Sequence, residues 1–347
     1  MKTLALLVML SVPCASLSSE PPAVAATEPS APLPQRLSDT GLYVAGSAAT
    51  VRADGIAFAP QYPLWSDGTS KRRWIYLPPG TAIDASRIDA WEFPAGTRLW
   101  KEFGYDRRVE TRYIERLTDG SWRFAAYVWN KEGTDAVLAA EDGEVLPVSA
   151  APAGRYAVPA RNDCLACHEG APVPVLGFSA LQLSPDRDPL APHAGPAQNA
   201  HANLSSLVAS GRLHNLPRRF LEQPPRIAAT SPIERAALGY LHGNCGHCHN
   251  DAGALMGLEL VLAQRADAAA QSSKRTMQSL LGHSSRFRPQ DADRAQRIAR
   301  DGGTHVLTLR MKTNNPLARM PPLGVQQFDA EGVALIERWI NQNFSNR

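Results

Sequence analysis

The sequence is organised around the stretch Asn244-Cys245-Gly246-His247-Cys248-His249, which contains the pattern Cys-x-x-Cys-His. In c-type haem attachment the two thiols of this pattern add across the two vinyl groups of the porphyrin. The histidine after the second cysteine is then placed to bind the iron as proximal ligand. A second copy of the pattern lies upstream at Cys164-Leu165-Ala166-Cys167-His168. The sequence therefore predicts two covalent c-type haems, attached through Cys164, Cys167, Cys245 and Cys248, with His168 and His249 as iron ligands.

The cysteine count supports this interpretation. The chain has five cysteines, of which Cys14 lies in the apolar N-terminus and the other four belong to the two motifs. Two alternatives remain open. A zinc site would need four ligands that converge, and a redox dithiol would need its motif between a strand and a helix of a βαβ unit, a pattern that surrounds neither pair.

The N-terminus has the features of a secretory signal. Met1-Lys2-Thr3 gives a positive start, and residues 4–10 form an apolar core too short to span a bilayer. Small residues at 23–26 offer a cleavage site, so we predict a signal peptide over residues 1–26 and the loss of Cys14 with it. Because c-type haem is attached outside the energy-transducing membrane, the predicted location is periplasmic or secreted. No other apolar run reaches spanning length, so the mature protein is expected not to span a membrane.

The length and net charge of the chain limit the number of domains and the class of partner. The chain has 347 residues, which suggests two or three domains, and its formal net charge of +3 gives no case for nucleic-acid binding. Residues 27–60 are rich in Pro, Ala and Ser, a composition typical of a linker or extended arm.

Residues 61–160 have a β pattern. In residues 108–117 Val109, Thr111 and Tyr113 alternate with charged Glu110 and Arg112, which predicts a strand with one apolar and one charged face. An Asp-Gly turn follows, and residues 122–129 return as an aromatic-rich strand. Shorter strands are predicted at 73–77, 90–93 and 155–158. We expect an all-β, sandwich-like domain or small barrel whose Trp and Tyr side chains form its core, with residues 65–68 and 71–73 as polar loop.

Residues 161–230 hold the first haem motif and a Pro-rich segment in which residues 204–213 are the best helical candidate. Its three histidines, His193, His201 and His214, are candidates for the sixth ligand of the first iron.

Residues 231–347 have the clearest helical signals. Ser231-Pro232-Ile233-Glu234 is a capping box with Pro at the first helical position, so a helix begins there and leads to Cys245. Asp329 can cap a second helix over 330–341, whose apolar face is Val333, Ile336, Trp339 and Ile340. Two such helices cross in a class I cytochrome c fold. We therefore predict an all-α cytochrome c-like domain here, and an α+β multidomain protein overall.

Met320 is the predicted sixth ligand of the second iron. It lies in Arg319-Met320-Pro321-Pro322, just ahead of the last helix, and a thioether ligand favours ferrous iron. The alternatives are that Met320 only fills the core, or that Met311 is the ligand. Residues 263–303 interrupt this region with many arginines, which indicates a solvated helical insertion or a docking surface for an acidic redox partner.

Several motifs together resemble a poorly characterised family of secreted bacterial dihaem cytochrome c-like proteins. The resemblance covers most of the chain after the signal and implies haem binding and export, without an established substrate. The motifs are Pro63-Leu64-Trp65-Ser66-Asp67-Gly68, Glu110-Thr111-Arg112, Tyr127-Val128-Trp129-Asn130, Asp163 to His168 and Tyr240 to Asn250.

The sequence favours an exported dihaem cytochrome that transfers electrons to or from a redox partner protein, because it shows a closing methionine and no distal catalytic group. One alternative is a dihaem peroxidase or haem oxidase, which would keep one iron open beneath an acid–base residue. Another is a β module that binds a partner while the haems report redox state.

Overall fold

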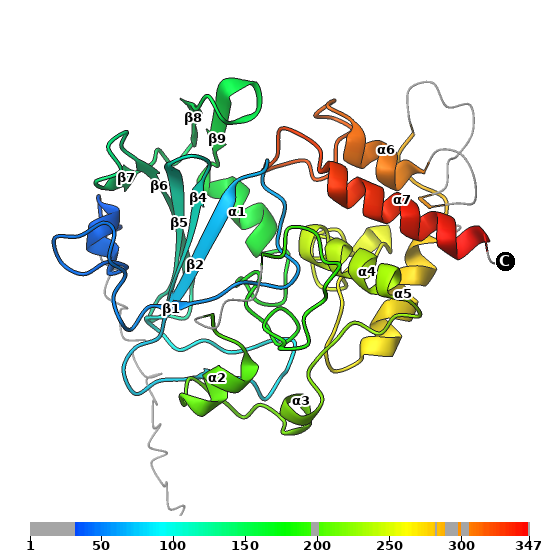
Figure 1. The fold of residues 1–347 in the computed structure, drawn as a ribbon, viewed down its shortest axis with the longest axis horizontal. Coiled ribbons are helices and arrows are strands. Elements are labelled where there is room, and N and C mark those ends of the chain that lie inside the picture. The colour runs from blue at the N-terminus through cyan, green and yellow to red at the C-terminus, as the bar shows by residue number, and fades with distance from the viewer. Residues whose placement is uncertain (1–31, 196–200, 282, 289–297, 300–304, 346–347) are drawn as a thin grey trace, which may run out of the picture. The chain divides into compact units, whose positions relative to one another are not determined.

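An antiparallel sheet of six strands, in the order β1-β2-β4-β5-β6-β7, dominates the N-terminal half of the computed structural model (Figure 1). Its strands are β1 (Ile56–Ala57), β2 (Ser70–Tyr76), β4 (Arg98–Gly104), β5 (Arg108–Arg116), β6 (Trp122–Trp129) and β7 (Ala136–Leu138). The strands predicted at 108–117 and 122–129 are confirmed. The strand predicted at 90–93 does not form, because Glu92 makes only an isolated bridge to Asp84.

Two small sheets accompany the large one. β3 (Ile83–Asp84) pairs in parallel with β10 (Leu213–His214), and β8 (Glu144–Pro147) pairs with β9 (Arg155–Val158). The structure describes residues 32–195, 201–281, 283–288, 298–299 and 305–345. The predicted signal peptide, Cys14 and the first residues of the predicted linker lie outside these ranges.

One face of the large sheet carries an aromatic core. Alternate residues of β2, β4, β5 and β6 place Trp74, Trp100, Tyr113, Tyr127 and Trp129 together, all buried, as the sequence predicted for this domain. Within the segment predicted as a linker, Leu37, Leu42 and Tyr43 are buried against these rings. The short 3-10 helix η1 (Leu37–Thr40) lies in that segment.

The opposite face of the sheet is covered by helix and irregular chain. Helix α1 (Arg161–His168) lies beside the sheet and contacts β6 (Figure 1). The chain then continues through α2 (Leu204–Ala209) and α3 (Arg219–Glu222), and Phe178, Leu183 and Leu204 pack against Ile75 and Leu99 of the sheet. The predicted sandwich is therefore wrong, since within the described residues no second sheet of comparable size faces the first.

Two predicted helices are confirmed near the C-terminus. In α4 (Pro232–Asn244) the Ser231 hydroxyl accepts a hydrogen bond from the Glu234 N–H at 3.1 Å. In α7 (Ala330–Ser345) the Asp329 carboxylate accepts one from the Gly332 N–H at 3.0 Å. The two helices pack together, and a Cβ on Gly332 would lie 2.3 Å from the Tyr240 ring, so this crossing needs glycine.

The prediction of an all-α cytochrome c-like domain is wrong. Between α4 and α7 the described residues form two helices, α5 (Ala269–Leu280) and α6 (Val306–Lys312), and the 3-10 turn η3 (Met256–Leu258). Chain from the N-terminal half also belongs to this core, because Tyr62, between β1 and β2, packs against Gly239 of α4 and joins the cluster that includes Trp339. The residues from Pro32 onward form one compact unit of mixed helix and sheet. Hydrophobic periodicity marked the helices correctly but could not show that they share a core with chain from the N-terminal half.

The Arg-rich segment 263–303 is only partly described. Helix α5 lies in it, and its Ser272, Ser273, Thr276 and Leu280 are buried, so this helix is not a solvated insertion. Residues 282, 289–297 and 300–303, with several of the arginines, lie outside the described ranges. Among the described residues, no helix combines the length and apolar character needed to cross a membrane.

Candidate haem-binding site

The first Cys-x-x-Cys-His motif lies entirely on α1. The Asp163 carboxylate accepts a hydrogen bond from the Ala160 N–H at 3.0 Å, which stabilises the start of the helix. Residues three and four apart share one side of a helix, so Cys164, Cys167 and His168 face the same way. All three line one cavity between the sheet and the C-terminal region.

His168 has the hydrogen bonding expected of a metal ligand. Its Nδ1 lies 2.5 Å from the carbonyl oxygen of Pro174, so Nδ1 carries the proton and donates, and Nε2 is left with its lone pair. Burial, with the charges of Lys101 and Arg112, lowers the pKa of His168 to about 4, although the bond to Pro174 opposes this shift. The imidazole is therefore neutral near pH 7, the form that binds metal.

The second motif follows the C-terminal end of α4, and Asn250 organises it. The Asn250 amide donates to the carbonyls of Gly246 and His247, each at 3.0 Å, and to the carbonyl of Gly170 at 2.7 Å. The last bond ties this turn to the residues just after the first motif. His249 is half-buried, its Nδ1 has no hydrogen-bond partner among the described residues, and burial lowers its pKa.

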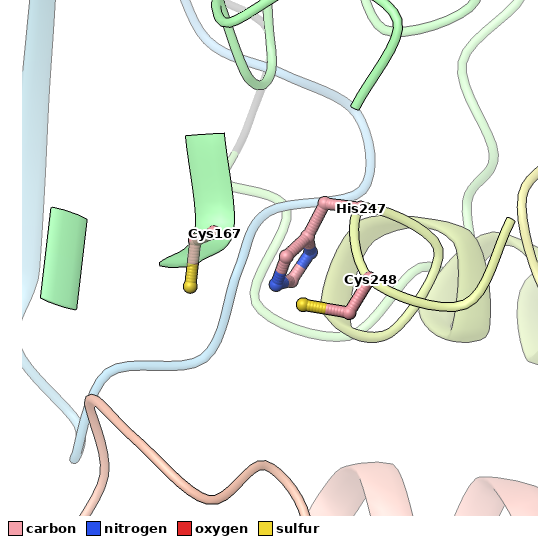
Figure 2. Close-up of side chains that lie close together, drawn as sticks. All are labelled: Cys167, His247 and Cys248. Carbon is pink, nitrogen blue, oxygen red and sulfur yellow. The ribbon is translucent and has the colours of Figure 1, made fainter. Parts of the chain in front are cut away.

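The two motifs meet. A Cβ on Gly170 would lie 2.8 Å from the carbonyl oxygen of His247, so the two turns are in close contact. Figure 2 shows Cys167 of α1 facing His247 and Cys248, and one ligand atom from each lies within 4.8 Å of the other two. A hydrogen bond between the thiols raises the pKa of Cys167 and lowers that of Cys248.

This cluster bears on the zinc alternative. Structural zinc takes four ligands, and the described residues bring three together. Cys164 and Cys245 are not members of the group, although each belongs to one of the motifs.

A cavity of about 1120 Å³ lies next to these motifs. Typical ligand pockets measure roughly 300–1,000 Å³, so a group as large as a porphyrin can be held here. Its wall includes Phe93, Trp91, Val175 and Phe178, which gives it an apolar surface suited to a porphyrin ring. His242 of α4 and His247 of the second motif border it, whereas His249 is not part of its wall.

The three histidines proposed as sixth ligands of the first iron do not line this cavity. His193 Nε2 hydrogen-bonds the Asp329 carboxylate at 2.9 Å, and its ring lies 4.8 Å from that of Trp65. His214 is exposed on β10. His201 has a buried Nδ1 without a partner among the described residues, and burial, with Arg187 and Arg73, lowers its pKa.

Met320 lies in a loop that borders the same region. Its N–H donates to the Arg310 carbonyl at 2.9 Å, and the charge of Arg310 contributes to the lowered pKa of His249. Asp67 holds the chain just downstream, because its carboxylate accepts bonds from the N–H groups of Gln326 at 2.9 Å and Gln327 at 3.0 Å. This assigns a structural role to the segment predicted as polar loop.

Met311 is a core residue. It is buried on α6, 8% exposed, in the cluster that contains Trp339 and Ile336. Met311 therefore contributes to the packing of α6 against α7.

Sequence reasoning missed four polar residues of the cavity wall, Arg73, Lys101, Arg112 and His242. Arg112 was placed on the charged face of its strand, which was expected to face away from the apolar core. Arg73 was placed where the polar loop 71–73 meets the strand predicted at 73–77, whereas β2 already begins at Ser70. The strand that carries Lys101 was not predicted. The sequence contains one of these cations in each of three strands, β2, β4 and β5. Only the register of the strands shows that the three are neighbours.

No family model matches the chain, and no curated protein and no solved structure is significantly similar to it. The resemblance to dihaem cytochrome c-like proteins therefore rests on the motifs alone.

Proposed function

We propose that this protein is an exported c-type cytochrome that carries two covalently attached haems and transfers electrons. The observation that carries the proposal is the contact between the chain segments that carry the two Cys-x-x-Cys-His motifs, joined by the Asn250–Gly170 bond, because groups bound at the two motifs would be neighbours. Export and the resemblance to the dihaem family belong to the same proposal and rest on the sequence.

The residues at the first motif fit a haem. Cys164 and Cys167 would form the thioether bonds, and His168 would bind the iron through Nε2 while Nδ1 donates to Pro174. The bound group would supply a one-electron couple, and the chain's residues fix its orientation and exclude water. The apolar cavity wall provides that exclusion.

The residues at the second motif fit less completely. Cys245 and Cys248 would attach the group, and His249 and Met320 would be the ligands of its iron. A buried imidazole nitrogen without a partner is unfavourable, so the unpartnered Nδ1 of His249 is consistent with a ligand at this ring.

An enzyme with one open iron is the second candidate function. The observation that favours it is His242, which lines the cavity with His168. The Gln264 N–H donates to His242 Nδ1 at 3.0 Å, so in the neutral ring the proton is on Nε2. An acid–base group next to a haem pocket is what a peroxidase or oxidase would need.

Haem attachment is tested on protein purified from a host with a c-type haem attachment system. Denaturing gels stained for haem peroxidase activity should show covalent haem in wild type and about half the signal per chain in the double variant Cys245→Ala, Cys248→Ala. Adding Cys164→Ala and Cys167→Ala should abolish the signal.

Metal analysis of the same samples separates haem from zinc. Wild-type protein that contains zinc and no covalent haem would refute the proposal. If haem is present, spectra before and after peroxide decide between the two candidates. Two low-spin irons that do not respond favour the carrier, and a high-spin iron that forms an oxidised species favours the enzyme.

A further inference from the structure

Three cations form a row across adjacent strands of the large sheet. Arg73 of β2 lies opposite Lys101 of β4, and Lys101 lies opposite Arg112 of β5. Directly paired residues of neighbouring strands point to the same side of a sheet, and like charges placed opposite each other destabilise the pairing. All three line the cavity beside the first motif.

Only one member of the row is neutralised by a neighbouring acid. Arg112 forms an ion pair with Glu110, with Nε and Oε1 2.8 Å apart, and the fully buried Glu110 carboxylate also accepts a bond from the Tyr156 hydroxyl. Among the described residues, Arg73 and Lys101 form no ion pair and no side-chain hydrogen bond. At this row the cavity wall therefore carries an excess of positive charge.

Like charges this close together are unfavourable without a counter-charge near them. Burial, together with Arg73, Lys71 and Arg112, lowers the pKa of Lys101 well below its ordinary value. Lys101 Nζ lies 4.8 Å from the centroid of the Phe103 ring, a contact that offsets little of the charge. An anion would interact favourably with all three cations in these surroundings, where charges are poorly screened.

We propose that Arg73, Lys101 and Arg112 form a binding site for a carboxylate or small oxyanion inside the cavity. Guanidinium and ammonium groups that project from neighbouring strands on the same side of a sheet suit such oxygens. The anion has two possible sources, a propionate of a haem bound at the first motif or a free small anion that enters the cavity. The first source rests on the proposed function, and the second does not.

The test compares Lys101→Met with wild type and with the control Arg72→Gln. Methionine keeps an apolar stem beside Phe103 and removes the charge. Arg72 is the neighbour of Arg73 on the other face of β2, with a side chain 61% exposed and paired with Glu102. Arg73→Gln is the second site variant, in case Lys101→Met does not fold.

The first measurement is the thermal midpoint of the purified full-length protein with increasing millimolar sulfate at constant ionic strength. If the anion is free, wild type and Arg72→Gln show a saturable rise. Lys101→Met should then bind sulfate about tenfold or more weakly, the usual effect of losing a hydrogen bond to a charged group. Non-specific stabilisation by sulfate would act on all variants alike.

The second measurement is redox titration of the haem-loaded protein. If a propionate occupies the site, sulfate has no saturable effect. Lys101→Met should then lower the midpoint potential of one haem, because a nearby cation favours the ferrous state, and Arg72→Gln should leave both potentials unchanged.

The proposal is overturned if sulfate gives no saturable response and Lys101→Met leaves both potentials unchanged. Haem staining identifies failure of the proposed function separately. If the protein carries no haem, the sulfate titration alone decides, and absence of a saturable rise overturns the anion site.

Discussion

Gly239→Ala should destabilise the protein, although alanine is the better helix former. Gly239 lies inside α4, and a Cβ there would be 2.0 Å from the nearest ring atom of Tyr62. Non-bonded carbons prefer a separation of about 3.5–4.0 Å, so the ring would have to move by about 1.5–2 Å. Tyr62 is 2% exposed, and its hydroxyl donates to the Asp188 carboxylate at 3.2 Å, so it has little room to move.

The expected magnitude combines three effects. Adding a methyl group to a well-packed core costs about 1–3 kcal/mol. Displacing the ring also weakens the bond between Tyr62 and Asp188, and hydrogen bonds to charged groups contribute about 1.5–3 kcal/mol. The intrinsic preference of a helix for alanine returns about 1 kcal/mol. We expect a net loss of about 2–4 kcal/mol in the free energy of unfolding.

Urea unfolding measures this loss as a lower midpoint at an unchanged slope. Gly257→Ala is the matched control, because a Cβ there meets nothing within 4 Å, and it should change stability by less than about 0.5 kcal/mol. In the background Tyr62→Ala the cost of Gly239→Ala should largely vanish, since the two sites are coupled through direct contact. If Gly239→Ala is more stable than wild type, the packing of Tyr62 on α4 is refuted.

Two further predictions concern Met320 and His242, which lie outside the second motif itself. Met320→Ala should open the second iron of the haem-loaded protein and allow it to bind carbon monoxide. Met311→Ala should leave the haem spectrum intact and lower the free energy of unfolding in urea by about 2–5 kcal/mol. The opposite pattern would make Met311 the ligand. Burial lowers the pKa of His242 to about 4 from an ordinary value of about 6.5. Between these pH values the unfolded chain binds more protons than the folded one, so stability should fall as the pH is lowered through this window. In His242→Gln, whose amide can still accept the Gln264 N–H, unfolding midpoints from pH 7 to 4 should decline less, and an unchanged decline would refute this role.

Local signals in the sequence predicted single elements well. The capping box at Ser231 and the cap at Asp329 mark the starts of α4 and α7 correctly, because such bonds form between residues close in sequence. The alternation in residues 108–117 and the turn after it predicted β5 and β6 for the same reason. The predicted strand at 90–93 failed, since tertiary packing kept this segment as one bridge outside the large sheet.

Long-range contacts explain why the fold class predicted from the sequence was wrong. Tyr62 and Asp67 lie between β1 and β2 of the large sheet. Tyr62 nevertheless packs on α4, and Asp67 accepts bonds from the N–H groups of Gln326 and Gln327, contacts that no local pattern shows. The helices of the C-terminal region therefore share a core with the N-terminal half, and do not close on themselves as an all-α domain would.

The sequence by itself determined the candidate chemistry of this protein. Two thiols and a histidine at fixed spacing define each candidate haem motif, because c-type attachment depends on covalent geometry within five consecutive residues. Only the tertiary structure brought the two motifs together, with Cys167 beside His247 and Cys248. It alone placed Arg73, Lys101 and Arg112 side by side in the cavity, because a shift of one residue in register turns a side chain to the other face of the sheet.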